Sequence, residues 1–246
     1  MIRKIARRLV GDAIKQHYTS FSVFNEAVNF EKQCIFIAVP KTGTTSVRSQ
    51  LTQPGQAFIE APHLNAMQVR DCLYTYFLKQ SLGTNIRFPN TNAPSDADIR
   101  KKAKDVFDTF FKFSAVRNPW ARAVSMYSRR EGVQIKADMS FDEFCQQHIY
   151  ASDTCFYPTL HHNQLDWLCD ENGKCLMDYV YKLEDFEKAL VEIAEKTSGR
   201  IILQKEDANR NPDSGSRSYR DLYTDETKKL IAKHFEKDID FFKYTF

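Results

Sequence analysis

The segment IFIAVPKTGTTSVRSQL, residues 35–51, joins an apolar run to a loop of small residues and then to a helical pattern. The apolar run over 34–39 is typical of a strand buried on both faces of a parallel sheet. A loop that leads from such a strand into a helix directs backbone N–H groups at the space above the helix, where the helix dipole also attracts anions. The segment therefore predicts a phosphate cradle. Its residues are Lys41, Thr42, Gly43, Thr44, Thr45 and Ser46.

The cradle departs from the nucleoside-triphosphatase pattern G-x-x-x-x-G-K-[ST], in which the lysine follows the second glycine. Here Lys41 precedes Gly43, and the sequence offers no evident strand-end aspartate to hold Mg²⁺. We therefore expect the loop to bind a phosphate without requiring a metal.

Composition and charge restrict the class of protein. A chain of 246 residues that is 42% hydrophobic can bury one sizeable core, and no stretch is apolar for the roughly 18–20 residues of a membrane span. Residues 1–16 hold five basic side chains and Asp12, a net charge of +4, whereas the whole chain has a formal charge of +3. Residues 17–246 therefore carry a net charge of −1 and give no indication of a nucleic-acid surface. Apolar residues at helical spacing in 1–16 predict an amphipathic helix, which either packs on the domain or lies on a membrane surface.

The six cysteines form no C-x-x-C pair, so the sequence does not predict a zinc site, and we expect reduced thiols. Cys169 and Cys175 flank a segment whose Asn172-Gly173 predicts a tight turn. The two thiols could therefore face each other across a hairpin, either free or joined as a disulfide.

Strand and helix patterns alternate along the chain. Strands are predicted over 34–39, 57–61, 112–116, 177–184 and 200–204. Helices are predicted over 65–80, 98–111, 120–130, 185–197 and 224–242, and Ser140 with Glu143 resembles a capping box. The alternation predicts an α/β fold, three layers deep (αβα), with a central mostly parallel sheet of about five strands. Ligands of such sheets bind beyond the carboxyl ends of the strands, where the cradle lies.

A second block, FKFSAVRNPWARAVSMY over 111–127, follows the same logic. It puts Arg117 at the end of a predicted strand, where a guanidinium can hold a phosphate, and Ser125 two turns along the next helix. Together with VPKTGTTS, this block resembles the sulfotransferases that use 3′-phosphoadenosine-5′-phosphosulfate (PAPS). The cradle is similar to their 5′-phosphosulfate loop. Arg117 and Ser125 match the arginine and serine, eight residues apart, that bind the 3′-phosphate in that family.

Later stretches extend the resemblance to the carbohydrate-type (family 2-like) branch, which includes Golgi glycan and many bacterial sulfotransferases. They are NQLDWLCDENGKCLMDYVYKLEDFEKAL and YRDLYTDETKKLIAKHFEKDIDFFKYTF. The resemblance implies one sulfotransferase domain over 34–246, with a fold like that of P-loop nucleoside triphosphatases, after a basic lead-in over 1–33. Golgi relatives carry a transmembrane anchor, and we find none in this sequence. Either the enzyme is of the soluble, bacterial type, or the sequence is a piece of a longer protein; the initial Met and the basic helix favour the former, so we expect a cytoplasmic enzyme. Peripheral membrane contact through 1–16 stays open.

The resemblance also implies the reaction. A sulfuryl group would pass in line from PAPS to a hydroxyl or amine of a carbohydrate or small metabolite, leaving 3′-phosphoadenosine-5′-phosphate (PAP), with no metal required. Lys41 would stabilise the departing phosphate. His63 is the first candidate for the base that deprotonates the acceptor, because many family members carry a histidine at a comparable place, and Glu60 is the substitute. A helix-capping or surface histidine is the alternative for His63.

Further residues are weaker candidates. His161, His162 and Gln164 fall where the family lines the acceptor side, although solvated loop histidines would look the same. Arg217 and Tyr219 lie in a polar loop that would close over the nucleotide. A core position is the expected role of Trp120.

Two other functions remain open at this stage. A nucleotide-binding module without turnover would keep the cradle and Arg117 but lack a working base. A Mg²⁺-dependent small-molecule kinase would need the lysine position that the loop lacks. The sequence does not indicate an oligomeric state.

Overall fold

The computed structural model describes residues 27–52, 63–82, 94–128, 139–148, 162–205 and 218–246. The predicted N-terminal helix over 1–16 and the predicted strand over 57–61 lie outside these ranges.

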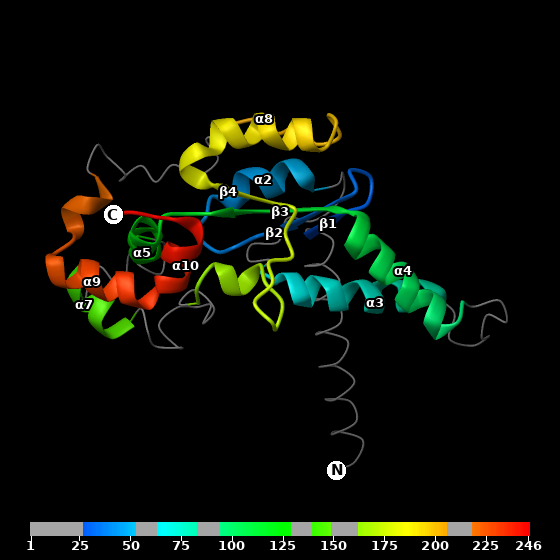
Figure 1. The fold of residues 1–246 in the computed structure, drawn as a ribbon, viewed down its shortest axis with the longest axis horizontal. Coiled ribbons are helices and arrows are strands. Elements are labelled where there is room, and N and C mark those ends of the chain that lie inside the picture. The colour runs from blue at the N-terminus through cyan, green and yellow to red at the C-terminus, as the bar shows by residue number, and fades with distance from the viewer. Residues whose placement is uncertain (1–26, 53–62, 83–93, 129–138, 149–161, 206–217) are drawn as a thin grey trace, which may run out of the picture.

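A four-stranded sheet forms the centre of the described fold, in the order β1-β2-β3-β4 (Figure 1). Its strands are β1 (Val28–Asn29), β2 (Cys34–Ile37), β3 (Phe111–Val116) and β4 (Tyr179–Lys182). β2 pairs parallel with β3 and β3 pairs parallel with β4, while β1 is an antiparallel edge strand. The predicted mostly parallel α/β sheet is confirmed, and the carboxyl ends of three strands meet at one edge.

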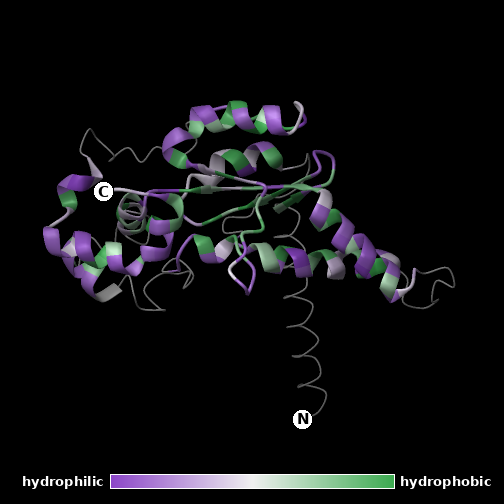
Figure 2. Ribbon diagram, in the orientation of Figure 1, coloured by the Kyte–Doolittle hydropathy of each residue, from purple (hydrophilic) through white to green (hydrophobic). Residues whose placement is uncertain are grey.

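Both faces of this sheet are covered. Alternate residues of β2 point to opposite faces, so Phe36 joins one apolar core and Ile35 and Ile37 join the other. On the first face lie α2 (Thr44–Leu51) and α8 (Phe186–Lys196), and α3 (Ala66–Leu82) lies across the sheet from them (Figure 1). Figure 2 shows apolar and polar residues mixed along these helices, and the apolar residues Val47, Leu51, Ala189 and Ile193 of α2 and α8 belong to the same buried core as Phe36. This is the three-layer arrangement that the alternating pattern predicts.

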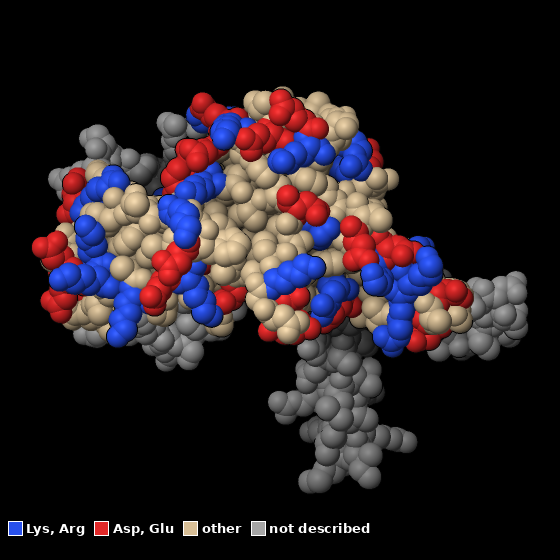
Figure 3. Space-filling model, viewed as in Figure 1, with Lys and Arg blue, Asp and Glu red and all other residues tan. Residues whose placement is uncertain are grey.

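The remaining helical elements surround this centre. They are α4 (Asp96–Thr109), α5 (Pro119–Tyr127), α7 (Phe141–Glu143), η1 (Phe144–His148), η3 (Leu165–Trp167), η4 (Leu183–Asp185), η5 (Tyr219–Leu222), α9 (Asp225–His234) and α10 (Glu236–Phe242). The predicted capping box of Ser140 with Glu143 is confirmed at the start of α7. On the face in Figure 3, Lys and Arg side chains are interspersed with Asp and Glu rather than gathered into a patch of one sign.

Two elements differ from the sequence prediction. Residues 200–204 form no strand: Ile201 and Leu203 are buried in the expected alternation, but the side-chain amide of Gln50 binds both the N–H (2.7 Å) and the C=O (3.0 Å) of Gln204. That amide takes the place of a neighbouring strand. The single helix predicted over 224–242 is divided at the fully buried Phe235, whose φ of −105° and ψ of 30° separate α9 from α10.

The predicted turn at Gly173 is confirmed. Its φ is +79°, and Cys169 and Cys175 form an isolated antiparallel bridge on either side of it. Both cysteines are free thiols. Burial raises the pKa of the Cys169 thiol to about 12, with a smaller contribution from the neighbouring Cys175, so this thiol stays protonated at neutral pH.

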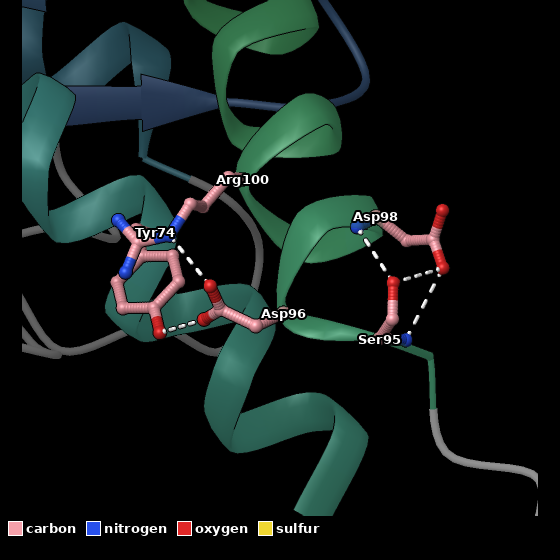
Figure 4. A network of polar contacts seen from close by, with 5 residues as sticks. All are labelled: Tyr74, Ser95, Asp96, Asp98 and Arg100. Carbon is pink, nitrogen blue, oxygen red and sulfur yellow. Dashed lines mark hydrogen bonds and ion pairs between the residues drawn. The ribbon is translucent and has the colours of Figure 1, made fainter.

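Helices α3 and α4 pack together, and a polar network joins them at the start of α4 (Figure 4). The Tyr74 hydroxyl donates to Asp96 (2.5 Å), Arg100 Nε donates to the same carboxylate (2.7 Å), and the Arg100 guanidinium lies 4.4 Å from the centroid of the Tyr74 ring. Ser95 caps α4 in a reciprocal box with Asp98. Hydrogen bonds from Ser95 lower the pKa of the Asp98 carboxyl.

We predict that Ser95→Ala destabilises the protein by about 1 kcal/mol at neutral pH, because the first turn of α4 loses its cap. Since the pKa of Asp98 is lower in the folded state, the reciprocal bonds stabilise the protein above the unfolded pKa and weaken as the pH falls through the folded one. The difference between wild type and variant in urea denaturation should therefore shrink toward acid pH. Thr109→Ala, at the other end of α4, is the control and should cost less. An equal loss in both variants would contradict the capping role.

Candidate active site

The cradle occupies the connection from β2 to α2. Gly43 is the N-cap residue of α2 and has φ +73°, so it offers no capping side chain to the first turn. The fully buried Thr42 donates its hydroxyl to the Val39 carbonyl (2.9 Å), which holds the loop against the strand end. Lys41 also has a positive φ of 68°. The predicted strand, loop and helix are therefore confirmed, with a helix N-terminus that suits an anion.

A side chain at Gly43 would also require Leu183 to move. A Cβ built on it would lie 2.7 Å from Cδ1 of Leu183, the residue that follows β4. The loop is thus pressed against the end of the third parallel strand.

Arg117 comes directly after β3, and its Nη1 donates to the Lys41 carbonyl at 3.4 Å. The two predicted phosphate motifs, 76 residues apart, therefore meet at one sheet edge. Burial lowers the pKa of the Arg117 guanidinium, while Glu184 acts in the opposite direction. An anion bound beside this half-buried cation would offset the cost of its desolvation.

The turn after Arg117 explains the sequence RNP. Asn118 is the N-cap of α5 and accepts from the N–H of Trp120 (3.1 Å), while Pro119 fills the first helical position. The Asn118 N–H donates to Glu184 Oε1 (2.8 Å). Ser125 lies on α5, partly buried, as the eight-residue spacing predicts.

Gln164 lies just before η3 and is fully buried. Its Oε1 accepts from the Arg117 N–H (2.8 Å), and its Nε2 donates to the Arg117 carbonyl (2.8 Å). We expected Gln164 to line the acceptor side, but its amide faces the protein interior and holds the backbone of Arg117.

His63 is half-buried at the same edge of the sheet. Its Nδ1 lies 2.8 Å from the Ala38 carbonyl, and the ring meets Trp167 edge to face, with centroids 6.1 Å apart. Because a carbonyl only accepts, Nδ1 carries the proton in the neutral ring and Nε2 is the basic nitrogen. The alternative that His63 caps α3 is wrong, because Asn65 and Gln68 exchange the capping hydrogen bonds.

The other predicted residues have varied outcomes. His162 is exposed, and Tyr219 is half-buried in η5, where its ring packs against Phe246. Trp120 is a core residue, as expected, with Nε1 donating to the Lys228 carbonyl (3.0 Å). Glu60, His161 and Arg217 lie outside the described residues.

Sequence reasoning missed three charged residues near the strand ends: Arg122, Glu184 and Asp238. Arg122 lies inside the second motif and is fully buried. A charged residue does not add to the apolar periodicity from which buried positions are predicted, so the sequence carries no indication of its burial. Asp238 and Glu184 act through hydrogen bonds to backbone N–H groups, which sequence spacing does not reveal.

Within the described ranges, no group of three or more His, Cys, Asp or Glu side chains is arranged to hold a metal ion. Over the same part of the chain, no helix is both long and apolar enough to cross a membrane.

A loop that leads into a helix N-terminus and an arginine at the neighbouring strand end give an α/β fold of the P-loop-like kind, with an edge whose chemistry suits an anion. A model of the sulfotransferase family matches residues 27–245, so the chain belongs to the sulfotransferase family. Membership makes it a transferase of sulfuryl groups. The chain matches no curated protein and no solved structure.

We predict that Gly43→Ala lowers the thermal midpoint more than Gly173→Ala does. Both positions have φ between 70° and 80°, so both variants pay about 1–2 kcal/mol of backbone strain. Only Gly43 also meets Leu183, whereas a Cβ on Gly173 has nothing within 4 Å. Calorimetric melting of the two variants measures the difference, and equal midpoints would mean that Leu183 moves aside without cost.

Proposed function

We propose that this chain transfers the sulfuryl group of PAPS to a hydroxyl or amine of an acceptor and releases PAP, without a metal ion. The observation that carries the proposal is the approach of Arg117 to the Lys41 carbonyl beside the N-terminus of α2. Two anion-binding features at one sheet edge suit a nucleotide with phosphate groups at both the 5′ and 3′ positions. Membership of the sulfotransferase family supports the same donor.

The roles of the donor residues are assigned from the family resemblance and from the arrangement of the strand ends. The N–H groups and hydroxyls of the cradle bind the 5′-phosphosulfate, and Arg117 with Ser125 binds the 3′-phosphate. The resemblance assigns to Tyr219, and to Arg217 outside the described residues, the role of closing over the nucleotide. Lys41 lies where negative charge develops on the departing phosphate, so its ammonium stabilises the transition state more than the ground state.

The transfer step needs a base and an aligned acceptor. The acceptor oxygen or nitrogen forms a bond to sulfur while the bond from sulfur to the phosphate oxygen breaks, and the electron pair leaves with PAP. His63 is the proposed base, because its Nδ1–H is held by the Ala38 carbonyl and Nε2 is then the nitrogen able to take the acceptor proton. Glu60, His161 and His162 are the alternatives. A carbohydrate or small metabolite is the proposed acceptor.

The donor is tested by calorimetric titration of the protein with PAP in the presence of EDTA. AMP and ATP, which lack the 3′-phosphate, are titrated as controls. We expect PAP to bind more tightly than AMP, and Arg117→Ala to weaken PAP binding by about 10- to 100-fold, because a charged hydrogen-bond donor is lost. Arg200→Ala is the matched control, since Arg200 contacts Gln33 at the amino-terminal end of β2. Binding of ATP alone, and only after Mg²⁺ is restored, would support a kinase and contradict the proposal.

The base is tested by His63→Ala. With PAPS and a panel of sugar, amine and phenol acceptors, we expect PAP release to fall by about 10²- to 10⁴-fold while PAP affinity stays near that of the wild type. His234→Gln, on α9, is the control. Wild-type turnover in the His63→Ala variant would transfer the role to one of the alternative bases. A wild-type protein that binds PAP but never releases it from PAPS with any acceptor would favour the binding module.

A further inference from the structure

Three polar side chains are fully buried behind the strand ends that carry the two donor motifs. They are Arg122 on α5, Gln164 before η3 and Asp238 on α10. Burial of charged groups is costly unless hydrogen bonds replace the lost water. Each of the three makes such bonds, and each set of bonds ends on the backbone of a neighbouring segment.

Asp238 fixes Gln164. One carboxylate oxygen, Oδ2, accepts from the Gln164 N–H (2.8 Å) and from the Gln164 side-chain Nε2 (3.1 Å), and Oδ1 accepts from the Leu165 N–H (2.9 Å). All three partners donate, so they favour the ionised carboxylate. Burial nevertheless raises the pKa of Asp238, with the charge of Arg122 and these bonds acting in the opposite direction. The carboxylate also orients the Gln164 amide, because Nε2 must point toward it.

The oriented amide then holds Arg117. With Nε2 on the Asp238 side, Gln164 can pair at once with the N–H and the C=O of Arg117, both at 2.8 Å. Arg117 is the first residue after β3, so this pair of bonds extends the backbone pairing of the sheet by one residue. The Arg117 side chain itself reaches Lys41 only at 3.4 Å. Its position is therefore set mainly through its backbone.

Arg122 ties the cradle to the same segment. Its Nε donates to the carbonyl of Pro40, the residue before Lys41 (3.1 Å), and its Nη1 donates to the His162 carbonyl (3.0 Å). The guanidinium also lies 5.5 Å from the centroid of the Phe235 ring, at the break between α9 and α10. The 162–165 segment is thus bonded to the cradle on one side and to Arg117 on the other.

We propose that Gln164 and Asp238 are positioning residues that set the Arg117 guanidinium relative to the cradle, and so determine the preference for a nucleotide with a 3′-phosphate. The inference rests on the proposed PAPS donor. It goes further in assigning part of the donor specificity to two side chains that are buried behind the sheet edge and act through Arg117.

The test compares PAP with AMP, which share the 5′-phosphate and differ at the 3′ position. Gln164→Glu keeps the shape of the side chain but turns a carboxylate oxygen toward the Arg117 carbonyl and toward Asp238. Gln164→Met removes the bonds without adding charge, and it decides the question if the Glu variant fails to fold. We expect PAP affinity to fall by at least about tenfold and AMP affinity to change little.

Asn163→Asp is the matched control. It makes the same amide-to-carboxylate change one residue away, where the side chain contacts the backbone of His234 and Asp238 rather than Arg117. We expect it to keep the wild-type ratio of PAP to AMP affinity. In turnover assays, the Gln164 variants should raise KM for PAPS while kcat at saturating donor changes little, because the 3′-phosphate is remote from the transferred group.

The outcomes separate the two proposals. Folded Gln164 variants with lower melting temperatures but an unchanged PAP to AMP ratio would overturn the positioning role and leave a purely structural one. Failure of the wild-type protein to prefer PAP over AMP would remove the proposed donor, and the positioning inference would fall with it. A reduced ratio in the Gln164 variants alone supports the inference.

Discussion

The parallel pairing of β2 with β3 is the constraint on which the site depends. Its register sets Phe36 opposite Phe113 and Ile37 opposite Ser114, and the Ser114 hydroxyl adds a bond to the Ile37 carbonyl (2.7 Å). Because parallel strands end at the same edge, the loop after one and the arginine after the other emerge side by side. The proposed two-phosphate site needs both motifs.

Polar groups are buried at this edge at a cost that an apolar core would avoid. Leu183 packs on Gly43. The side chains of Arg122, Gln164 and Asp238 form hydrogen bonds with the backbones of neighbouring segments. Replacing such a cluster by apolar side chains is often neutral for stability in other proteins, so its value here lies in geometry. A phosphate site needs rigid donors because small displacements of a guanidinium weaken a charged hydrogen bond steeply.

Local patterns were reliable where the segment alone decides the structure. The apolar run at 34–39, the capping box of Ser140 with Glu143 and the turn at Gly173 depend on neighbours within a few residues, and all three were predicted. Prediction failed where a distant partner intervenes. Gln50 satisfies the backbone of Gln204 in place of a strand, and burial of Phe235 divides the last helix.

The sequence by itself determined the α/β alternation around β2 and β3, the glycine-containing loop between β2 and α2 and the arginine that follows β3, because each rests on the local chemistry of the chain. Only the tertiary structure decided what surrounds them. The hydrogen bonds around them join residues far apart in the chain: His63 with Ala38 (25 positions), Gln164 with Arg117 (47 positions) and Asp238 with Gln164 (74 positions). Such contacts depend on how the layers pack, and spacing along the chain carries no record of them.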